Sequence, residues 1–178
     1  MTAKSVHIAL IAALSLLAGA SAALADDNPT LLGAFKDWSA YTTGTPSFGK
    51  VCYVLGQPKS SDPRSVKRDS VYFLISDWPA RKVKAEPEVV PGYPYKDDSK
   101  VTVQVGSDKF QLFTRNDHDS GAAWVQATSD EARLIDAMRR GSQLIVTGTS
   151  SRGTLTKDVY SLSGISAALD KIHSACGV

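Results

Sequence analysis

The sequence has few of the residues on which most enzyme chemistry depends. Its 178 residues include two cysteines and three histidines. It has no C-x-x-C, H-E-x-x-H or G-x-S-x-G motif and no glycine loop suited to a phosphate. These absences argue against a thiol oxidoreductase, a zinc peptidase, a nucleophile-elbow hydrolase and a nucleotide-binding enzyme. We therefore expect a non-enzymatic protein with no catalytic residues, no metal and no cofactor.

The chain also lacks a large excess of charge of either sign. Its 20 basic and 18 acidic side chains leave a formal net charge of +2, so there is no broad electrostatic reason to expect a nucleic acid partner. Short basic clusters occur at Arg64, Lys67 and Arg68 and again at residues 81–84. Such clusters are typical of a solvated face, although they also suit an anionic surface or headgroup.

Long apolar runs are absent after the first 25 residues. Residues 8–18 form one apolar run, which follows Lys4 and precedes a small-residue stretch ending Ala23-Leu24-Ala25. This is the pattern of a cleaved secretory signal peptide, and the run is well short of the ~20 residues that a membrane-spanning helix needs. We expect cleavage after Ala25 and a mature chain, residues 26–178, with no transmembrane segment. Because Asp26 stands where a lipoprotein has cysteine, we expect no lipid anchor.

The predicted export places the mature chain outside the cytosol. Its length fits a single domain, since no internal repeat or low-complexity linker marks a second one. Cys52 and Cys176 are the only cysteines, and in an oxidising compartment such a pair is expected to form a disulfide. A catalytic thiol is disfavoured because His173 is the only histidine near either cysteine.

Short β-rich runs separated by Gly, Pro, Asn and Asp predict a mainly β fold, an antiparallel β-sandwich-type domain. In residues 101–105 apolar and polar side chains alternate, as expected for a strand with one buried face. Gly106-Ser107-Asp108 then predicts a hairpin to the next strand. The expected strands are residues 38–42, 50–56, 70–77, 84–90, 101–106, 109–115, 122–126, 144–149 and 157–162.

Two short helices complete the predicted fold. The first begins at Thr128, which with Glu131 has the spacing of a capping box, and ends before Gly141. The second covers about residues 165–175, with apolar residues at the spacing of one buried helix face. Because Cys176 lies at its end, the expected disulfide joins the C-terminal helix to the sheet.

Several segments of the mature chain form a recognisable series. In order, they are Lys50-Val51-Cys52-Tyr53, Gly92-Tyr93-Pro94, Ala137-Met138-Arg139-Arg140-Gly141, residues 148–154, residues 158–164 and Ala175-Cys176. Together they resemble the invasion-associated locus B family of secreted bacterial proteins. The resemblance covers nearly all of the mature chain and is most specific in its last thirty residues. It implies a periplasmic or surface-associated β-sandwich-type domain, which in pathogenic relatives is tied to entry into host cells, and it carries no established catalytic residues.

The C-terminal signature has two interpretations. In the structural one, its glycines allow sharp turns, its hydroxyls satisfy turn amides, and Asp158 bonds a backbone amide or Arg152. Tyr160 and Leu162 share one strand face and are core or sheet-surface residues. In the functional one, part of the signature lines a ligand-binding groove. The candidate groove residues are Ser150, Arg152, Gly153, Thr154, Asp158 and Tyr160.

Three classes of function remain open. The favoured one is a recognition or envelope-accessory module that binds an envelope or host-surface protein, with Trp78, Tyr93 and Tyr95 as candidate partner anchors. The alternatives are a small-molecule or glycan-acting hydrolase, which needs paired carboxylates across a cleft, and a purely structural envelope protein. His118, in the polar segment 116–119, lacks the spacing of a calcium loop, and His173 is expected to be an exposed or capping side chain.

Overall fold

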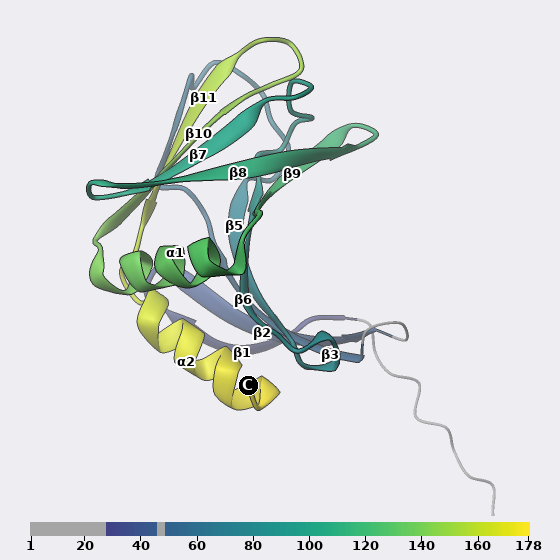
Figure 1. The fold of residues 1–178 in the computed structure, drawn as a ribbon, viewed down its shortest axis with the longest axis vertical. Helices are drawn as coiled ribbons and strands as arrows, with labels where there is room; N and C mark the ends of the chain where they lie inside the picture. Colours follow the sequence, from purple (N-terminus) through teal and green to yellow (C-terminus); the bar gives the residue numbers. More distant parts are fainter. Residues whose placement is uncertain (1–27, 46–48) are drawn as a thin grey trace, which may run out of the picture.

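The computed structural model describes residues 28–45 and 49–178. The predicted signal peptide, residues 1–25, lies outside these residues. No helix in the described ranges is both long enough and apolar enough to cross a bilayer. Figure 1 shows two helices packed beside a strongly bent β-sheet.

The element order is dominated by antiparallel strands. The elements are β1 (Thr30–Phe35), β2 (Trp38–Thr45), β3 (Gly49–Gly56), β4 (Ser60–Asp62), β5 (Tyr72–Trp78), the 3-10 helix η1 (Pro79–Arg81), β6 (Val83–Val90), β7 (Lys100–Val105), β8 (Asp108–Asp117), β9 (Ser120–Val125), α1 (Thr128–Arg140), β10 (Gln143–Thr149), β11 (Leu155–Ser161) and α2 (Ile165–Cys176). All nine expected strands and both expected helices are present, and the predicted fold class is confirmed.

The strands form one sheet in the order β1-β2-β3-β5-β6-β9-β8-β7-β10-β11-β4. The two layers of the sandwich are therefore parts of one continuous sheet that folds back on itself. Two contacts between strands far apart in this order show the closure. The indole N–H of Trp38 on β2 donates to the carbonyl of Ser161 on β11 at 2.9 Å, and the rings of Phe73 on β5 and Tyr160 on β11 meet edge to face at 6.0 Å.

Three local features differ from the sequence-based expectation. β1 was not predicted, because Gly33 breaks its apolar pattern at the point where its register with β2 shifts. β4 was not predicted because it is only three residues long. The predicted capping box is wrong: Ala127 is the N-cap of α1, with no side-chain cap hydrogen bond, and Thr128 is already helical.

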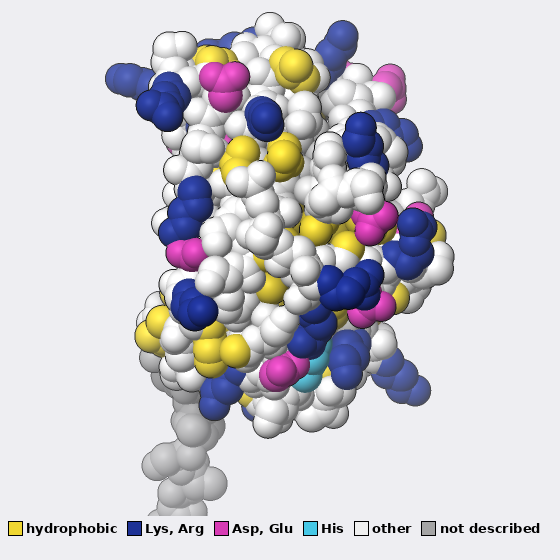
Figure 2. Space-filling model, turned by 90° about the vertical axis from the view of Figure 1, so that its left-hand side faces the viewer, with side chains coloured by type: hydrophobic (Ala, Val, Ile, Leu, Met, Phe, Trp, Pro, Cys, Tyr) yellow, Lys and Arg dark blue, Asp and Glu magenta, His cyan; other side chains and the backbone are white. Residues whose placement is uncertain are grey.

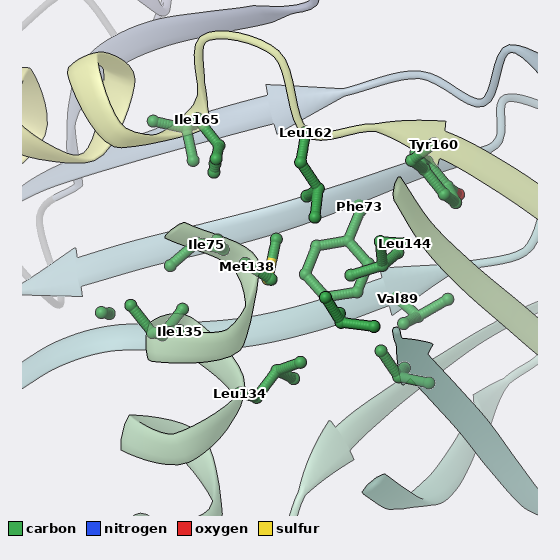
Figure 3. Packing of buried hydrophobic residues seen from close by; sticks show 14 of the residues in the cluster. Phe73, Ile75, Val89, Leu134, Ile135, Met138, Leu144, Tyr160, Leu162 and Ile165 are labelled. Carbon is green, nitrogen blue, oxygen red and sulfur yellow. The ribbon is translucent and has the colours of Figure 1, made fainter. Parts of the chain in front are cut away.

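The hydrophobic core lies between the inner face of the sheet and the two helices. Figure 3 shows Leu134, Ile135 and Met138 of α1 directed toward Phe73 and Ile75 of β5. α2 buries Ile165, Ala168, Leu169 and Ile172 and contacts β1, β2, β3 and β5. The buried residues of α2 are those that the apolar spacing in the sequence predicts. Both helices therefore pack their apolar sides on the same face of the sheet.

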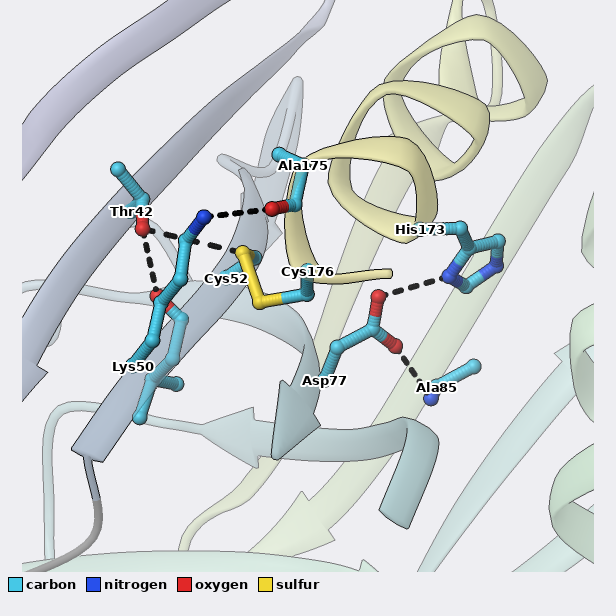
Figure 4. Close-up of a disulfide and its surroundings, with 9 residues drawn as sticks. Thr42, Lys50, Cys52, Asp77, Ala85, His173, Ala175 and Cys176 are labelled. Atoms are coloured by element: carbon cyan, nitrogen blue, oxygen red, sulfur yellow. Dashed lines mark hydrogen bonds and ion pairs between the residues drawn. A yellow bond between two sulfur atoms is a disulfide. The ribbon is translucent and has the colours of Figure 1, made fainter. Parts of the chain in front are cut away.

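The C-terminal end of α2 is attached to the sheet at three points (Figure 4). The predicted disulfide joins Cys52 on β3 to Cys176, with a Cα–Cα distance of 6.0 Å. The Lys50 ammonium donates to the carbonyl of Ala175 at 2.6 Å, where a cation also complements the negative end of the helix. His173 forms the third attachment through Asp77 on β5, 2.7 Å away.

A candidate recognition groove

A groove of about 630 Å³ lies between three segments that are distant in sequence. Residues 66–69 form one wall, Gly92, Tyr93 and Pro94 form another, and the turn between β10 and β11 forms the third. Asp119 and Thr156 complete the lining. The groove therefore combines the C-terminal signature with two loops that precede it by 50 residues or more.

Backbone contacts hold the three walls together. The amide of Asp69 donates to the carbonyl of Gly92 at 3.0 Å, and the amide of Ser151 donates to the carbonyl of Pro94 at 2.8 Å. Gly92 has φ +73°, and a Cβ at this position would lie 2.5 Å from the carbonyl oxygen of Asp69. Glycine is required here both by the backbone conformation and by the close approach of the neighbouring loop.

The signature turn orders itself through local hydrogen bonds. The Ser150 hydroxyl accepts from the Thr154 amide at 3.2 Å, and the Ser150 carbonyl accepts from the Gly153 amide at 2.8 Å. Gly153 has φ +82° and open space around it. Arg152, at the apex, is exposed, so the turn presents a cationic side chain to solvent on an ordered backbone.

A buried ion pair lies beneath the groove. The Arg68 guanidinium donates to both oxygens of Asp158, at 2.9 Å and 2.5 Å, and the Ser61 hydroxyl donates to the same carboxylate at 2.6 Å. The side chains of Arg68 and Asp158 are 6% and 3% exposed. The hydrogen bonds to Asp158 raise the pKa of Arg68. The two-point contact between the side chains fixes the wall that carries Arg68 onto β11.

Tyr93 links this pair to the groove wall. Its hydroxyl shares a 2.6 Å hydrogen bond with the Thr156 hydroxyl, and the Arg68 guanidinium lies 5.8 Å from its ring centroid, within the range of a cation–π interaction. Burial raises the pKa of Tyr93. The ring is partly exposed at the groove and is held in one orientation by both neighbours.

The structure separates the predicted groove residues into two sets. Ser150, Arg152 and Thr154 line the groove, with Gly153 in the same turn. Asp158 and Tyr160 do not line it, and they are 2% and 1% exposed. The expected pairing of Asp158 with Arg152 or a backbone amide is corrected, because Arg68 and Ser61 are its partners. Of the two positions expected for Tyr160, core or sheet surface, the structure shows the core, and burial raises its pKa.

The three predicted anchors also differ in their surroundings. Tyr93 lines the groove, whereas Tyr95 is 1% exposed and packs edge to face against Tyr93 at 5.5 Å. Tyr95 is therefore a core residue and not a contact for a partner. Trp78 is partly buried at the end of β5, with Arg81 5.4 Å from its ring, and it does not line the groove.

The two described histidines occupy different environments. His118 is exposed in the turn between β8 and β9, where its Nδ1 lies 2.7 Å from Asp117. His173 was expected to be exposed or capping, but its side chain is only 14% exposed and contacts the fully buried Asp77. The other oxygen of Asp77 accepts from the Ala85 amide at 2.8 Å. Asp77 thus holds both α2 and the start of strand β6, where Ala85 has φ +57°.

A second cavity of about 490 Å³ adjoins His173. Its charged lining includes two cationic side chains, Lys84 and Arg139, and three acidic ones, Glu131, Asp136 and Asp170. Arg139 is already paired with Asp170 at 2.9 Å. Within the described ranges, no three histidine, cysteine or carboxylate side chains are grouped closely enough to hold a metal ion.

Charge is mixed over the molecular surface that Figure 2 shows. Lys and Arg side chains are spread over this face with Asp and Glu side chains among them, and small hydrophobic areas lie between. The groove is similar: Lys67 and Arg152 are balanced by Asp69 and Asp119, since Arg68 is neutralised by Asp158. This balance favours a polar or zwitterionic ligand surface over a strongly charged one.

Sequence reasoning missed Arg68 and Asp77. Arg68 was assigned with its neighbours to a solvated face, and nothing in the local sequence distinguishes it from Lys67. Asp77 did carry a signal, because it continues the inward alternation of Phe73 and Ile75. A carboxylate at an inward strand position needs a partner, and that requirement points to a buried contact.

Comparisons with known proteins agree with this fold. The family model described as invasion associated locus B (IalB) protein matches residues 38–173. A similar solved structure is that of invasion associated protein B from Bartonella henselae, with a TM-score of 0.56, 17% identity, and coverage of 82% of this chain and 98% of that one. At this identity the structural likeness shows the fold alone. Among curated proteins, no match is found.

Proposed function

Because the chain belongs to the invasion associated locus B family, we propose that it is an exported bacterial envelope protein that recognises a partner without transforming it. The partner class is an envelope or host-surface protein, and the proposed recognition site is the groove between residues 66–69, 92–94 and the β10–β11 turn. The periplasm is the proposed location, with secretion or outer-surface display as further destinations.

Two features support export. Residues 1–25 have the three-part pattern of a secretory signal peptide. The Cys52–Cys176 disulfide belongs to a class of bond that persists in oxidising compartments outside the bacterial cytosol. Both features are independent of the groove, so the proposed location does not depend on the proposed binding site.

The observation that carries the recognition role is the rigid support of the groove. The Arg68–Asp158 pair and the Tyr93–Thr156 hydrogen bond fix the floor, and the backbone contacts at Gly92 and Ser151 fix the walls. Exposed Lys67 and Arg152 stand on this support. Loops held by a stable sheet are a common arrangement for binding surfaces, because little conformational entropy is lost on binding.

Affinity capture tests the proposed site. Immobilised residues 26–178 are incubated with envelope extract, and bound proteins are identified by mass spectrometry. Arg152→Glu reverses one exposed charge of the groove and leaves the Arg68–Asp158 pair intact. Lys171→Glu makes the same charge change on the exposed surface of α2 and is the control.

We expect a partner that is retained by the wild type and by Lys171→Glu and is lost with Arg152→Glu. Equal capture by all three proteins would exclude the groove as the binding site. Absence of any captured partner, together with turnover of a glycan or small ester substrate, would favour the hydrolase alternative.

A further inference from the structure

The outer face of the sheet carries a row of apolar and aromatic side chains with one carboxyl group among them. This face is opposite the one covered by α1 and α2, because buried residues such as Phe73, Val89 and Ala123 alternate with the row along each strand. The members of the row pair directly across five adjacent strands. From β3 to β8 they are Leu55, Leu74, Glu88, Trp124 and Phe113.

Further aromatic side chains flank this row on the same face. Tyr53 lies two residues before Leu55 and stacks on Tyr41 of β2, with ring centroids 5.3 Å apart. Tyr72 lies two residues before Leu74. Phe113 and Trp124 contact each other at 5.9 Å. We call this surface, formed by the row with Tyr41, Tyr53 and Tyr72, the aromatic face.

Glu88 lies at the centre of the aromatic face. It pairs with Leu74 on one side and with Trp124 on the other, and the Trp124 indole is its hydrogen-bonding partner. Burial, and then the neighbouring Glu86, raise the pKa of Glu88. A carboxyl group held among apolar rings needs hydrogen-bond donors, and the indole N–H supplies one of the several it can accept.

The aromatic face has no covering element in the described part of the chain. Figure 1 shows both helices on one side of β5 and β6, while the side toward the right of the view is bare between the β8–β9 hairpin and β3. The side chains of the aromatic face are all partly buried by one another. At the far end of the row, the Arg115 guanidinium lies 5.6 Å from the ring of Phe113.

The size of the face distinguishes between classes of occupant. A fully exposed aromatic side chain presents roughly 150–250 Å², so these partly buried residues together offer on the order of 300 Å². A stable protein interface needs about 800 Å² from each partner. The aromatic face is therefore too small for a stable second protein or second copy, but its row from Leu55 to Phe113 crosses five strands, or about 20 Å, which suits an extended small ligand.

The side chains of the aromatic face also restrict the chemical class of the ligand. An acyl chain would cover the rings but would supply no donor to Glu88, and an anion would be repelled by Glu86 and Glu88. A sugar has both required surfaces, because a pyranose ring carries apolar C–H faces and a rim of donating hydroxyl groups. We infer that the aromatic face binds a carbohydrate chain, with pyranose rings packed on Tyr53, Tyr72 and Trp124 and hydroxyl groups donating to Glu88.

Nuclear magnetic resonance titration tests this inference independently of the groove. Isotope-labelled residues 26–178 are titrated with two soluble β-1,4-linked hexasaccharides, one of glucose and one of N-acetylglucosamine. We expect at least one sugar to shift the Trp124 indole signal and the amides of Leu55 and Leu74 in a saturable manner. The groove amides of Ser151 and Arg152 should not shift, so a failure here leaves the proposed function of the groove standing.

Variants make the test specific to Glu88. Glu88→Ala is expected to raise the Kd at least about tenfold, because it removes the acceptor for the sugar hydroxyls, and Glu88→Gln, which keeps the side-chain shape, is expected to raise it severalfold. Glu131→Ala removes another partly desolvated carboxyl, on the helix-covered side, and should leave the Kd unchanged.

Three results would overturn the inference. The first is no shift with either sugar at millimolar concentration. The second is an unchanged Kd in a folded Glu88 variant. The third is that the same signals respond to protein concentration alone or to phosphatidylglycerol vesicles instead of sugar, which would identify a second copy or a membrane surface as the occupant.

Discussion

Removing the disulfide should lower the free energy of unfolding by about 5 kcal/mol. Cys52 and Cys176 are separated by 124 positions, and in the chain-entropy treatment a closed loop of that length contributes about 5 kcal/mol by restricting the unfolded chain. Deleting the fully buried Cys52 sulfur adds about 1 kcal/mol for lost packing. The double variant C52A/C176A should therefore retain the fold only if the remaining contacts of α2 suffice.

We expect those contacts to suffice for a folded but much less stable protein. Lys50 still binds the end of α2, Asp77 still binds His173, and Ile165, Leu169 and Ile172 stay buried. For a domain of this size, the combined loss of about 6 kcal/mol corresponds to a fall in Tm of roughly 12–24 °C. The slope of unfolding free energy against denaturant concentration should also rise, because the unfolded chain expands when the crosslink is lost.

Urea unfolding followed by circular dichroism measures both quantities. The wild type and C52A/C176A are compared with and without a reducing agent, and Lys171→Ala, an exposed change on the same helix, is the control. Reduction should bring the wild type close to the double variant and should leave the variant unchanged. A loss below about 2 kcal/mol, or an unchanged slope, would refute the loop-closure reasoning.

Three further changes test other parts of the structure. Asp158→Ala removes the carboxylate partner of the buried Arg68 and should lower the free energy of unfolding by about 3–5 kcal/mol. Arg152→Ala should stay within about 0.5 kcal/mol of the wild type. Thermal melts of both variants check this, and similar losses of stability would contradict the buried position of Asp158 and the exposed position of Arg152. In Gly92→Ala the new Cβ meets the Asp69 backbone, and the free energy of unfolding should fall by more than about 2 kcal/mol. Gly153→Ala, with a similar φ but open space around it, should lower it by about 1–2 kcal/mol. Denaturant titration compares the two variants, and equal losses would exclude contact with the Asp69 backbone as the cause. Because the folded-state pKa of Glu88 is raised, its contribution to stability is present at acid pH and is lost as pH rises through that pKa. Glu88→Gln should therefore have a higher Tm than the wild type at pH 7 and no advantage at pH 3. A Tm difference that does not change with pH would be inconsistent with the raised pKa.

Much of the fold was predictable because local signals agree with the tertiary structure. The alternation of Val101, Val103 and Val105 matches their buried positions, and the apolar spacing of α2 matches its buried face. Where the local signal is weak, as at Gly33 in β1, prediction failed. The capping box at Thr128 failed for a different reason, because the helix begins one residue earlier than the motif requires.

The candidate groove was only partly predictable. The C-terminal signature pointed to Ser150, Arg152 and Thr154, and these residues line the groove because a turn between two strands exposes its own residues. The opposite wall comes from residues 66–69, and the ion pair below it joins residues 90 positions apart. Such a long-range contact depends on the return of β11 to the layer beside β4, which no local pattern specifies.

The position of the crosslink also affects how the chain can mature. Cys176 follows Cys52 by 124 positions, so Cys52 has no partner until the chain has been made as far as the end of α2. Cys52 must therefore stay reduced while the intervening strands emerge, because an oxidant that acts earlier finds no second cysteine to pair with it. A product that stops before the last turn of α2 has no crosslink, so formation of the disulfide reports that this helix has been made and has docked on the sheet.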